Sequence, residues 1–127
     1  HDRAYLGASM RLLNIFAAVS GIVALAALIY AAHGLREVPS GDLATAIERI
    51  KLAAFIQLGA AAAALAIANR SGKLNLIAGA LILAGAAIFA GTLYGVSILG
   101  TPAALAPVGG ITLLAGWLAL AFANPGK

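Results

Sequence analysis

The side chains best suited to chemistry are a histidine and a carboxylate near the end of the first long apolar stretch. His33 precedes Glu37 by four residues, a spacing at which two side chains on one helix can share a metal ion or pass a proton. Gly34 lies between them and favours the end of the helix, which weakens this pairing. A histidine near a helix C-terminus also complements the helix dipole. We favour this structural role for His33 over a ligand or relay role.

The other polar residues do not form a recognisable catalytic site. Glu48 is interpreted as a solvated interface partner of Lys51 or Arg49. None of the four carboxylates lies inside an apolar stretch, so the acidic relay typical of proton pumps is not expected; they are Asp2, Glu37, Asp42 and Glu48. Cysteine is absent, and no glycine-rich phosphate loop or HExxH motif occurs. We therefore predict no enzymatic activity, no cofactor and no metal site.

The composition indicates a protein whose solvent is lipid. The chain has 127 residues, of which 63% are hydrophobic and 9% are charged, whereas a soluble domain typically has about a quarter charged residues. The mean hydropathy is +1.03. The net charge is +4, but the basic residues do not cluster into a stripe that could contact a phosphate backbone. We therefore expect no nucleic-acid partner. The basic excess is better explained by the positive-inside rule for membrane proteins.

Hydropathy predicts one four-span membrane domain over residues 1–127. The expected spans are about 12–32, 52–68, 74–99 and 102–123. Asp42 or Thr45 is the expected N-cap of the second helix. Because the chain starts at His1 and not at Met, residues 1–9 are a candidate leader or cloning remnant, with Met10 as the candidate native start.

The third span contains many small residues on related faces. They are Ala80, Ala84, Ala87, Gly91 and Gly95. Gly91 and Gly95 form a GxxxG motif, and such faces let helices approach closely in lipid. We expect them to pack helices inside the bundle or against another membrane protein.

The fourth span has two interpretations. If Pro107 starts the helix, the stretch to residue 123 is barely long enough to cross a membrane. If Thr101 is the N-cap, Pro107 lies inside a longer helix, removes a hydrogen bond to the Ala103 carbonyl and bends the helix. We favour the second, kinked interpretation, in which Gly109 and Gly110 leave a notch for a neighbouring helix.

The distribution of basic residues predicts the orientation. Four spans place both termini and the 69–73 turn on one side, together with Arg3, Arg11, Arg70, Lys73 and Lys127. The other side has Arg36, Arg49 and Lys51. Five basic residues against three favour cytoplasmic N- and C-termini. We predict an integral protein of the bacterial inner (plasma) membrane.

Three sequence motifs, which occur in the same order as in a known family, indicate a resemblance to that family. They are Ala32-His33-Gly34, Phe89-Ala90-Gly91-Thr92-Leu93-Tyr94, and Pro107-Val108-Gly109-Gly110 followed by Ala115-Gly116-Trp117. The chain resembles the YgdD / transmembrane protein 256-like family, small four-span membrane proteins that carry a domain-of-unknown-function label. That family commonly has a second histidine early in helix two, where this chain has Glu48 and Phe55. The resemblance implies an integral membrane protein and no established reaction.

These observations leave two classes of function. The first is a non-enzymatic accessory or interaction protein, bound within a larger membrane complex or as a homo-oligomer. The second is a small transporter or channel that acts as an oligomer, since interrupted helices often mark binding sites in transporters. We favour the first class. Tyr30, Tyr94 and Trp117 are candidate interfacial aromatics, although Trp117 is expected to lie deeper and to need a partner for its indole N–H.

Overall fold

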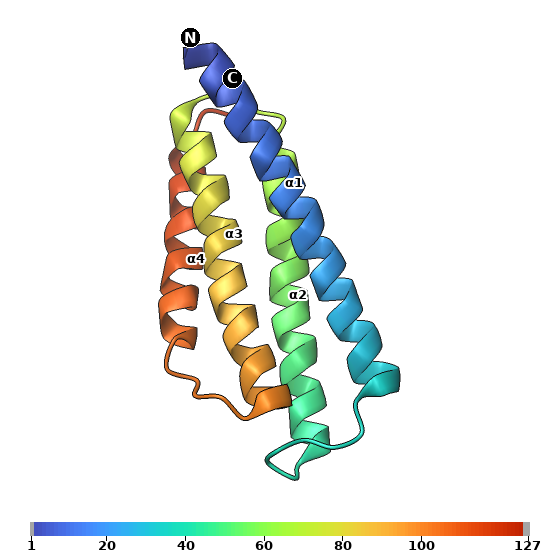
Figure 1. The fold of residues 1–127 in the computed structure, drawn as a ribbon. Coiled ribbons are helices and arrows are strands. Elements are labelled where there is room, and N and C mark those ends of the chain that lie inside the picture. The colour runs from blue at the N-terminus through green and yellow to red at the C-terminus, as the bar shows by residue number, and fades with distance from the viewer. Residues whose placement is uncertain (1, 126–127) are drawn as a thin grey trace.

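A computed structural model describes residues 2–125 as four antiparallel helical segments joined by short loops (Figure 1). Helix α1 (Asp2–Ile29) continues as the π-helical segment η1 (Tyr30–Gly34). Helix α2 (Leu43–Ile67) returns, and α3 (Lys73–Tyr94) continues as the second π-helical segment, η2 (Gly95–Leu99). Helix α4 (Ala106–Phe122) ends the described fold. The predicted all-α bundle is confirmed. His1 and Lys127, which entered the sequence predictions, lie outside the described residues, as do the side chains of Asp2 and Arg3.

The helix ends are fixed by local chemistry. At the start of α2 the Asp42 carboxylate accepts hydrogen bonds from the Thr45 backbone N–H (3.1 Å) and hydroxyl (2.7 Å), so Asp42 is the N-cap. The first helical stretch ends at Gly34, as expected, but Gly34 itself is not the C-cap. The cap after η1 is Leu35, whose N–H donates to the Tyr30 carbonyl. A Cβ on Gly34 would lie 2.7 Å from Cδ1 of the Tyr30 ring, so glycine makes room for that ring.

Packing is uneven around the bundle. Helix α3 packs along both α2 and α4, and α1 packs mainly on α2. Within residues 2–125, α4 contacts no helix other than α3. Figure 1 shows α1 diverging from α3 toward its C-terminal end. The main core lies where the first three helices meet, and its buried residues are Met10, Leu13, Ala17, Ala60, Ala64, Ile67, Ile82, Leu83 and Ala86.

The predicted kink at Pro107 is wrong. Helix α4 begins at Ala106, so Pro107 occupies its first turn, where a missing N–H leaves no helical hydrogen bond unmade. The Ala103 carbonyl, which was expected to be left free, accepts from the Ala106 N–H at 3.1 Å. Thr101, the expected N-cap, instead directly follows Gly100, the C-cap of η2, and its N–H donates to the Gly95 carbonyl at 3.2 Å. Gly100, with φ 73°, provides the turn.

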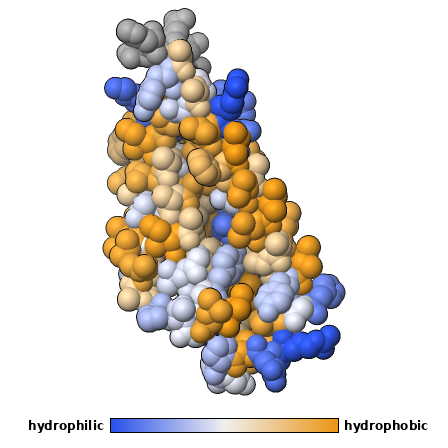
Figure 2. Space-filling view, viewed as in Figure 1, coloured by the Kyte–Doolittle hydropathy of each residue, from blue (hydrophilic) through white to orange (hydrophobic). Residues whose placement is uncertain are grey.

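The surface suits a membrane protein. Three described helical stretches are long and apolar enough to cross a bilayer: Ala4–Gly34, Leu43–Ile67 and Lys73–Leu99. Helix α4 is equally apolar but has only 17 residues, about 25 Å at the usual helical rise. Figure 2 shows hydrophobic residues over the middle of the molecule and hydrophilic residues gathered toward its two ends.

Candidate functional site

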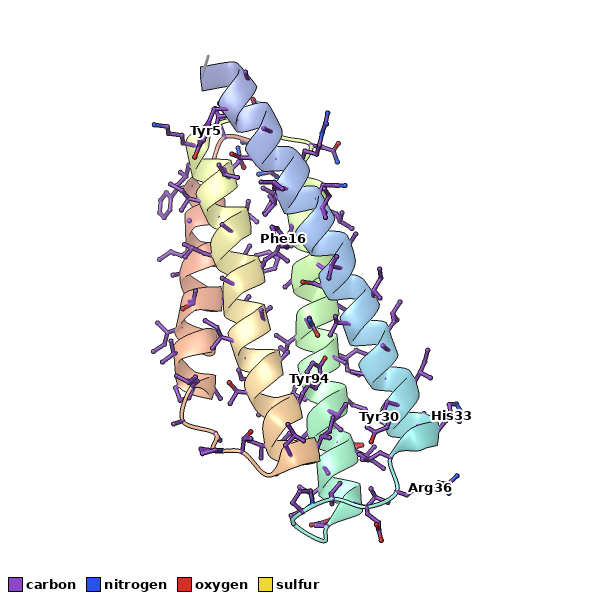
Figure 3. All side chains as sticks on the ribbon, in the orientation of Figure 1. Tyr5, Phe16, Tyr30, His33, Arg36 and Tyr94 are labelled. Carbon is purple, nitrogen blue, oxygen red and sulfur yellow. The ribbon has the colours of Figure 1, made fainter. Side chains whose placement is uncertain are left out.

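The most distinctive surface feature is an apolar groove between α1 and α3, here called the α1–α3 groove. Its volume is about 400 Å³. Its walls are Ser9, Leu12, Leu13, Phe16, Val19 and Ser20 of α1, and Leu76, Ala80, Leu83, Ala84 and Ala87 of α3. Phe16 is 61% exposed, and Figure 3 shows its ring in the space between the two helices. The groove forms because α1 leans across α2 and leaves this side of α3 uncovered.

A stripe of small residues on α3 forms the floor of this groove and continues past it. Ala80, Ala84 and Ala87 line the groove, and Gly91 extends the stripe; all four are exposed, and their spacing of four, three and four residues puts them on one helix face. A Cβ built on Gly91 would meet no atom within 4 Å. Gly95, the other half of the GxxxG motif, instead faces the side chain of Thr101. The stripe is therefore not used to pack helices within residues 2–125.

A second glycine surface joins α3 to α4 and is fully occupied. A Cβ on Gly109 would lie 2.8 Å from Phe89 Cα and 2.9 Å from the Gly85 carbonyl oxygen. A Cβ on Gly116 would lie 2.7 Å from the backbone N of Ile82. The two backbones thus touch at these points, which only glycine permits. Gly110 faces open space, so the expected notch exists at Gly109 alone. Gly85, which makes the reciprocal contact, was not predicted.

Buried polar side chains link α2 to the end of α3. Gln57 is 6% exposed and accepts a 2.7 Å hydrogen bond from the Tyr94 hydroxyl. Ser97, in η2, is 1% exposed and accepts from an Arg49 guanidinium nitrogen at 3.4 Å. Arg49 therefore points into the bundle, while Glu48 pairs with Lys51 at 3.4 Å. Among side chains in the described part of the chain, no buried nitrogen or oxygen lacks a partner.

Sequence reasoning missed these polar links for a simple reason. Gln57 is the one strongly polar residue in an otherwise apolar stretch of α2, and that isolation was a usable signal. Its partner lies 37 positions away, however, and no local pattern identifies such a pair. The Tyr94 hydroxyl is thus turned toward α2 rather than toward a membrane interface.

His33 and Trp117 make no such contacts. His33 lies in η1 with an exposed side chain, and Figure 3 shows it pointing away from the other helices. The residues that the structure describes contain no group of three metal-ligating side chains. Trp117 is 47% exposed on α4. It points outward, so the buried partner expected for its indole is not observed within residues 2–125.

Comparison with known families gives one match. A family model described as "Protein of unknown function (DUF423)" matches residues 25–110, which is more than half of the chain. The chain belongs to the DUF423 family. This match is compatible with the predicted resemblance to small four-span membrane proteins of unknown function. No curated protein and no solved structure matches the chain. The matched DUF423 region includes all of α2 and α3, and therefore both glycine surfaces of α3.

Proposed function

We propose that this DUF423 protein is a four-span integral membrane protein with a non-enzymatic role, binding a transmembrane helix of a partner in the α1–α3 groove. The observation that carries the proposal is the exposed stripe from Ala80 to Gly91. In a bilayer, apolar side chains gain little free energy by moving from lipid into a helix interface, so helix association depends on close packing at small residues. A stripe of small residues left open by its own fold is suited to this role.

The contrast between the two faces of α3 supports the proposal. The face at Gly85 is filled by α4, with backbone in contact with backbone. Leu12 and Phe16 of α1 form a wall along the stripe face, and Leu76, four residues before Ala80 on α3, lies at one end of it. A straight helix with small or medium side chains fits against such a surface.

The transporter alternative has less support. Its basis in the sequence was a Pro-Gly-Gly interruption within a helix, and Pro107 instead begins α4. Buried polar groups such as Gln57 and Ser97 are hydrogen-bonded to neighbouring side chains, which favours a structural role for them.

Photo-crosslinking tests the proposal directly. A photoreactive residue replaces Leu12 at the groove wall, and the membranes are irradiated before extraction. We expect a protein adduct of one defined mass that is lost when Ala84→Leu fills the groove. Ala62→Leu, at an exposed alanine of α2, is the matched control and should leave the adduct unchanged. An adduct of twice the chain's mass would identify a second copy as the partner. Lipid adducts alone, or protein adducts insensitive to Ala84→Leu, would contradict the proposal.

We further propose that both termini are cytoplasmic in a bacterial inner membrane, as the excess of basic residues at that end supports. The chain contains no cysteine, so single cysteines can report orientation without background. Ser40→Cys, in the loop before α2, should react with a membrane-impermeant maleimide in intact cells. Asn69→Cys, in the loop after α2, should react only after the cells are opened. The reverse labelling pattern would overturn the orientation.

A further inference from the structure

A second groove, here called the basic groove, lies on the opposite flank of α1. It is formed by the first turns of α1 and by the end of α2 with the following loop. Its volume is about 780 Å³. The residues that line it are Leu6, Gly7, Met10, Arg11 and Asn14 on one side, and Ala68, Asn69, Arg70, Ser71 and Gly72 on the other. The groove lies at the end of the bundle where the two termini come together (Figure 1).

The charges in this groove have one sign. Arg11 and Arg70 both line it, although they are far apart in the sequence. The one ion pair among the described side chains joins Lys51 to Glu48. Of the four carboxylates, Glu37, Asp42 and Glu48 belong to the loop before α2 or to its first turns, at the far end of the bundle (Figure 1), and the side chain of Asp2 lies outside the described residues. Two guanidinium groups therefore share a groove without a described carboxylate to neutralise them.

The structure also holds one of these guanidinium groups in place. Arg70 donates a 3.1 Å hydrogen bond to the Asn75 side-chain oxygen. Asn75 is 1% exposed, and its amide nitrogen donates at 2.9 Å to the carbonyls of both Ser71 and Asn124. This network, which joins the loop after α2 to the segment after α4, thus fixes Arg70 and lowers the entropy that Arg70 loses when it binds a ligand.

The start of α3 adds further positive potential. Gly72 is the N-cap of α3, and no side chain caps this helix end. The first backbone N–H groups of a helix carry partial positive charge and attract anions. Gly72 lines the basic groove, so the helix end and the two arginines act on the same space. Arginine forks and helix N-termini both favour phosphate oxygens.

We propose that the basic groove binds the phosphate of an anionic phospholipid headgroup. The groove combines an anion site with an apolar wall of Leu6, Met10 and Ala68, which suits the glycerol and first methylene groups of a lipid. Its place at the helix ends corresponds to the headgroup region of a bilayer crossed by these helices. Soluble phosphate shares the anionic chemistry but would leave the apolar wall uncovered.

Native mass spectrometry of the full chain in detergent micelles tests the proposal. The protein is titrated with phosphatidylglycerol and, separately, with zwitterionic phosphatidylcholine of the same acyl chains. We expect selective retention of phosphatidylglycerol, weakened about fivefold by Arg11→Gln, since one basic residue near lipid phosphates contributes roughly that factor. Arg70→Gln should weaken retention by a similar factor, because it removes the second positive charge. Glutamine keeps an amide N–H that can donate to Asn75, so the substitution is chosen to disturb the local network little. Arg36→Gln is the control, since Arg36 points away from the bundle at its far end (Figure 3).

Each outcome decides the proposal. Equal retention of the two lipids, or equal losses in the Arg11 and Arg36 variants, would overturn it. Binding of inorganic phosphate that displaces phosphatidylglycerol would assign the groove to a soluble phosphate compound and overturn the lipid assignment. Circular dichroism of each variant shows whether the helices are intact, and Arg11→Gln removes no hydrogen bond described in the fold. The result is independent of the partner proposal, which concerns the other flank of α1.

Discussion

Two adjacent glycines of α4 should respond in opposite directions to the same substitution. A Cβ on Gly109 would lie within 3 Å of backbone atoms of Phe89 and Gly85. Backbone cannot move aside as a flexible side chain can, so Gly109→Ala must push α3 and α4 apart. Overpacking of this kind typically costs about 1 to 3 kcal/mol. A Cβ on Gly110 would meet nothing within 4 Å.

Gly110→Ala should therefore stabilise the fold. Replacing glycine by alanine where the conformation allows it gains about 0.4 to 1 kcal/mol, mainly by restricting the unfolded chain. The two variants should then differ by roughly 1.5 to 4 kcal/mol in the free energy of unfolding. The difference between the two variants is the useful quantity, because both replace glycine by alanine at neighbouring positions of the same helix.

Unfolding by SDS in mixed micelles, followed by circular dichroism, measures this difference. Gly85→Ala is a reciprocal check, since Gly85 and Gly109 face each other across the interface. The double variant should cost less than the sum of the two single changes, because helices already separated by one methyl group admit the second more easily. If Gly109→Ala unfolds at the same SDS fraction as Gly110→Ala or later, the proposed backbone contact is wrong.

Three further predictions concern helix ends and buried polar groups. Pro107→Ala should change the free energy of unfolding by less than about 1 kcal/mol, whereas relief of a mid-helix proline would stabilise by about 3 kcal/mol; the same SDS titration distinguishes these values. Asn75→Leu should lower the free energy of unfolding by about 2 to 4 kcal/mol, because three hydrogen bonds are lost. Hydrogen exchange should also become faster in the segment after α4, and an unchanged rate there would refute the hydrogen bond between Asn75 and Asn124. Hydrogen bonds from the side chain and then the backbone N–H of Thr45 lower the pKa of the Asp42 carboxyl. Its contribution to stability is therefore present above the unfolded-state pKa and is lost as pH falls through the lower folded-state pKa, so Asp42→Asn should weaken that acid dependence of the melting temperature.

The helices themselves followed from hydropathy because their interiors are long and uninterrupted. The predicted stretches 12–32 and 74–99 lie within α1–η1 and α3–η2, and the stretch 52–68 passes the end of α2 by one residue. The start of α4 did not follow, since the preference for a full membrane-spanning length outweighed the chemistry of Pro107. The sequence contained the contrary signal: a proline in the first turn of a helix is common, and a proline in the interior is costly. At this position the preference of proline for the first turn of a helix decides the helix start, and the length needed to span a membrane does not.

The sites depended on distances along the chain that local patterns do not reveal. Arg11 and Arg70 look isolated in the sequence, and no cluster of basic residues was expected. They share a groove because α1 crosses the loop after α2. The pair formed by Gln57 and Tyr94 is similar, since it depends on the register between α2 and α3. Periodicity within one helix describes which residues share a face and says nothing about which face meets which neighbour.

The two surfaces of α3 show how a short step in sequence separates internal from external packing. Gly85 follows Ala84 directly and is therefore turned by about 100° around the helix axis. The face at Gly85 is buried against α4, which contacts no other helix in the described fold. The face at Ala84 would be covered only if α1 ran alongside α3, but α1 instead leans onto α2. Because its fourth helix attaches to α3 alone, the bundle leaves the stripe of small residues open to a helix from outside.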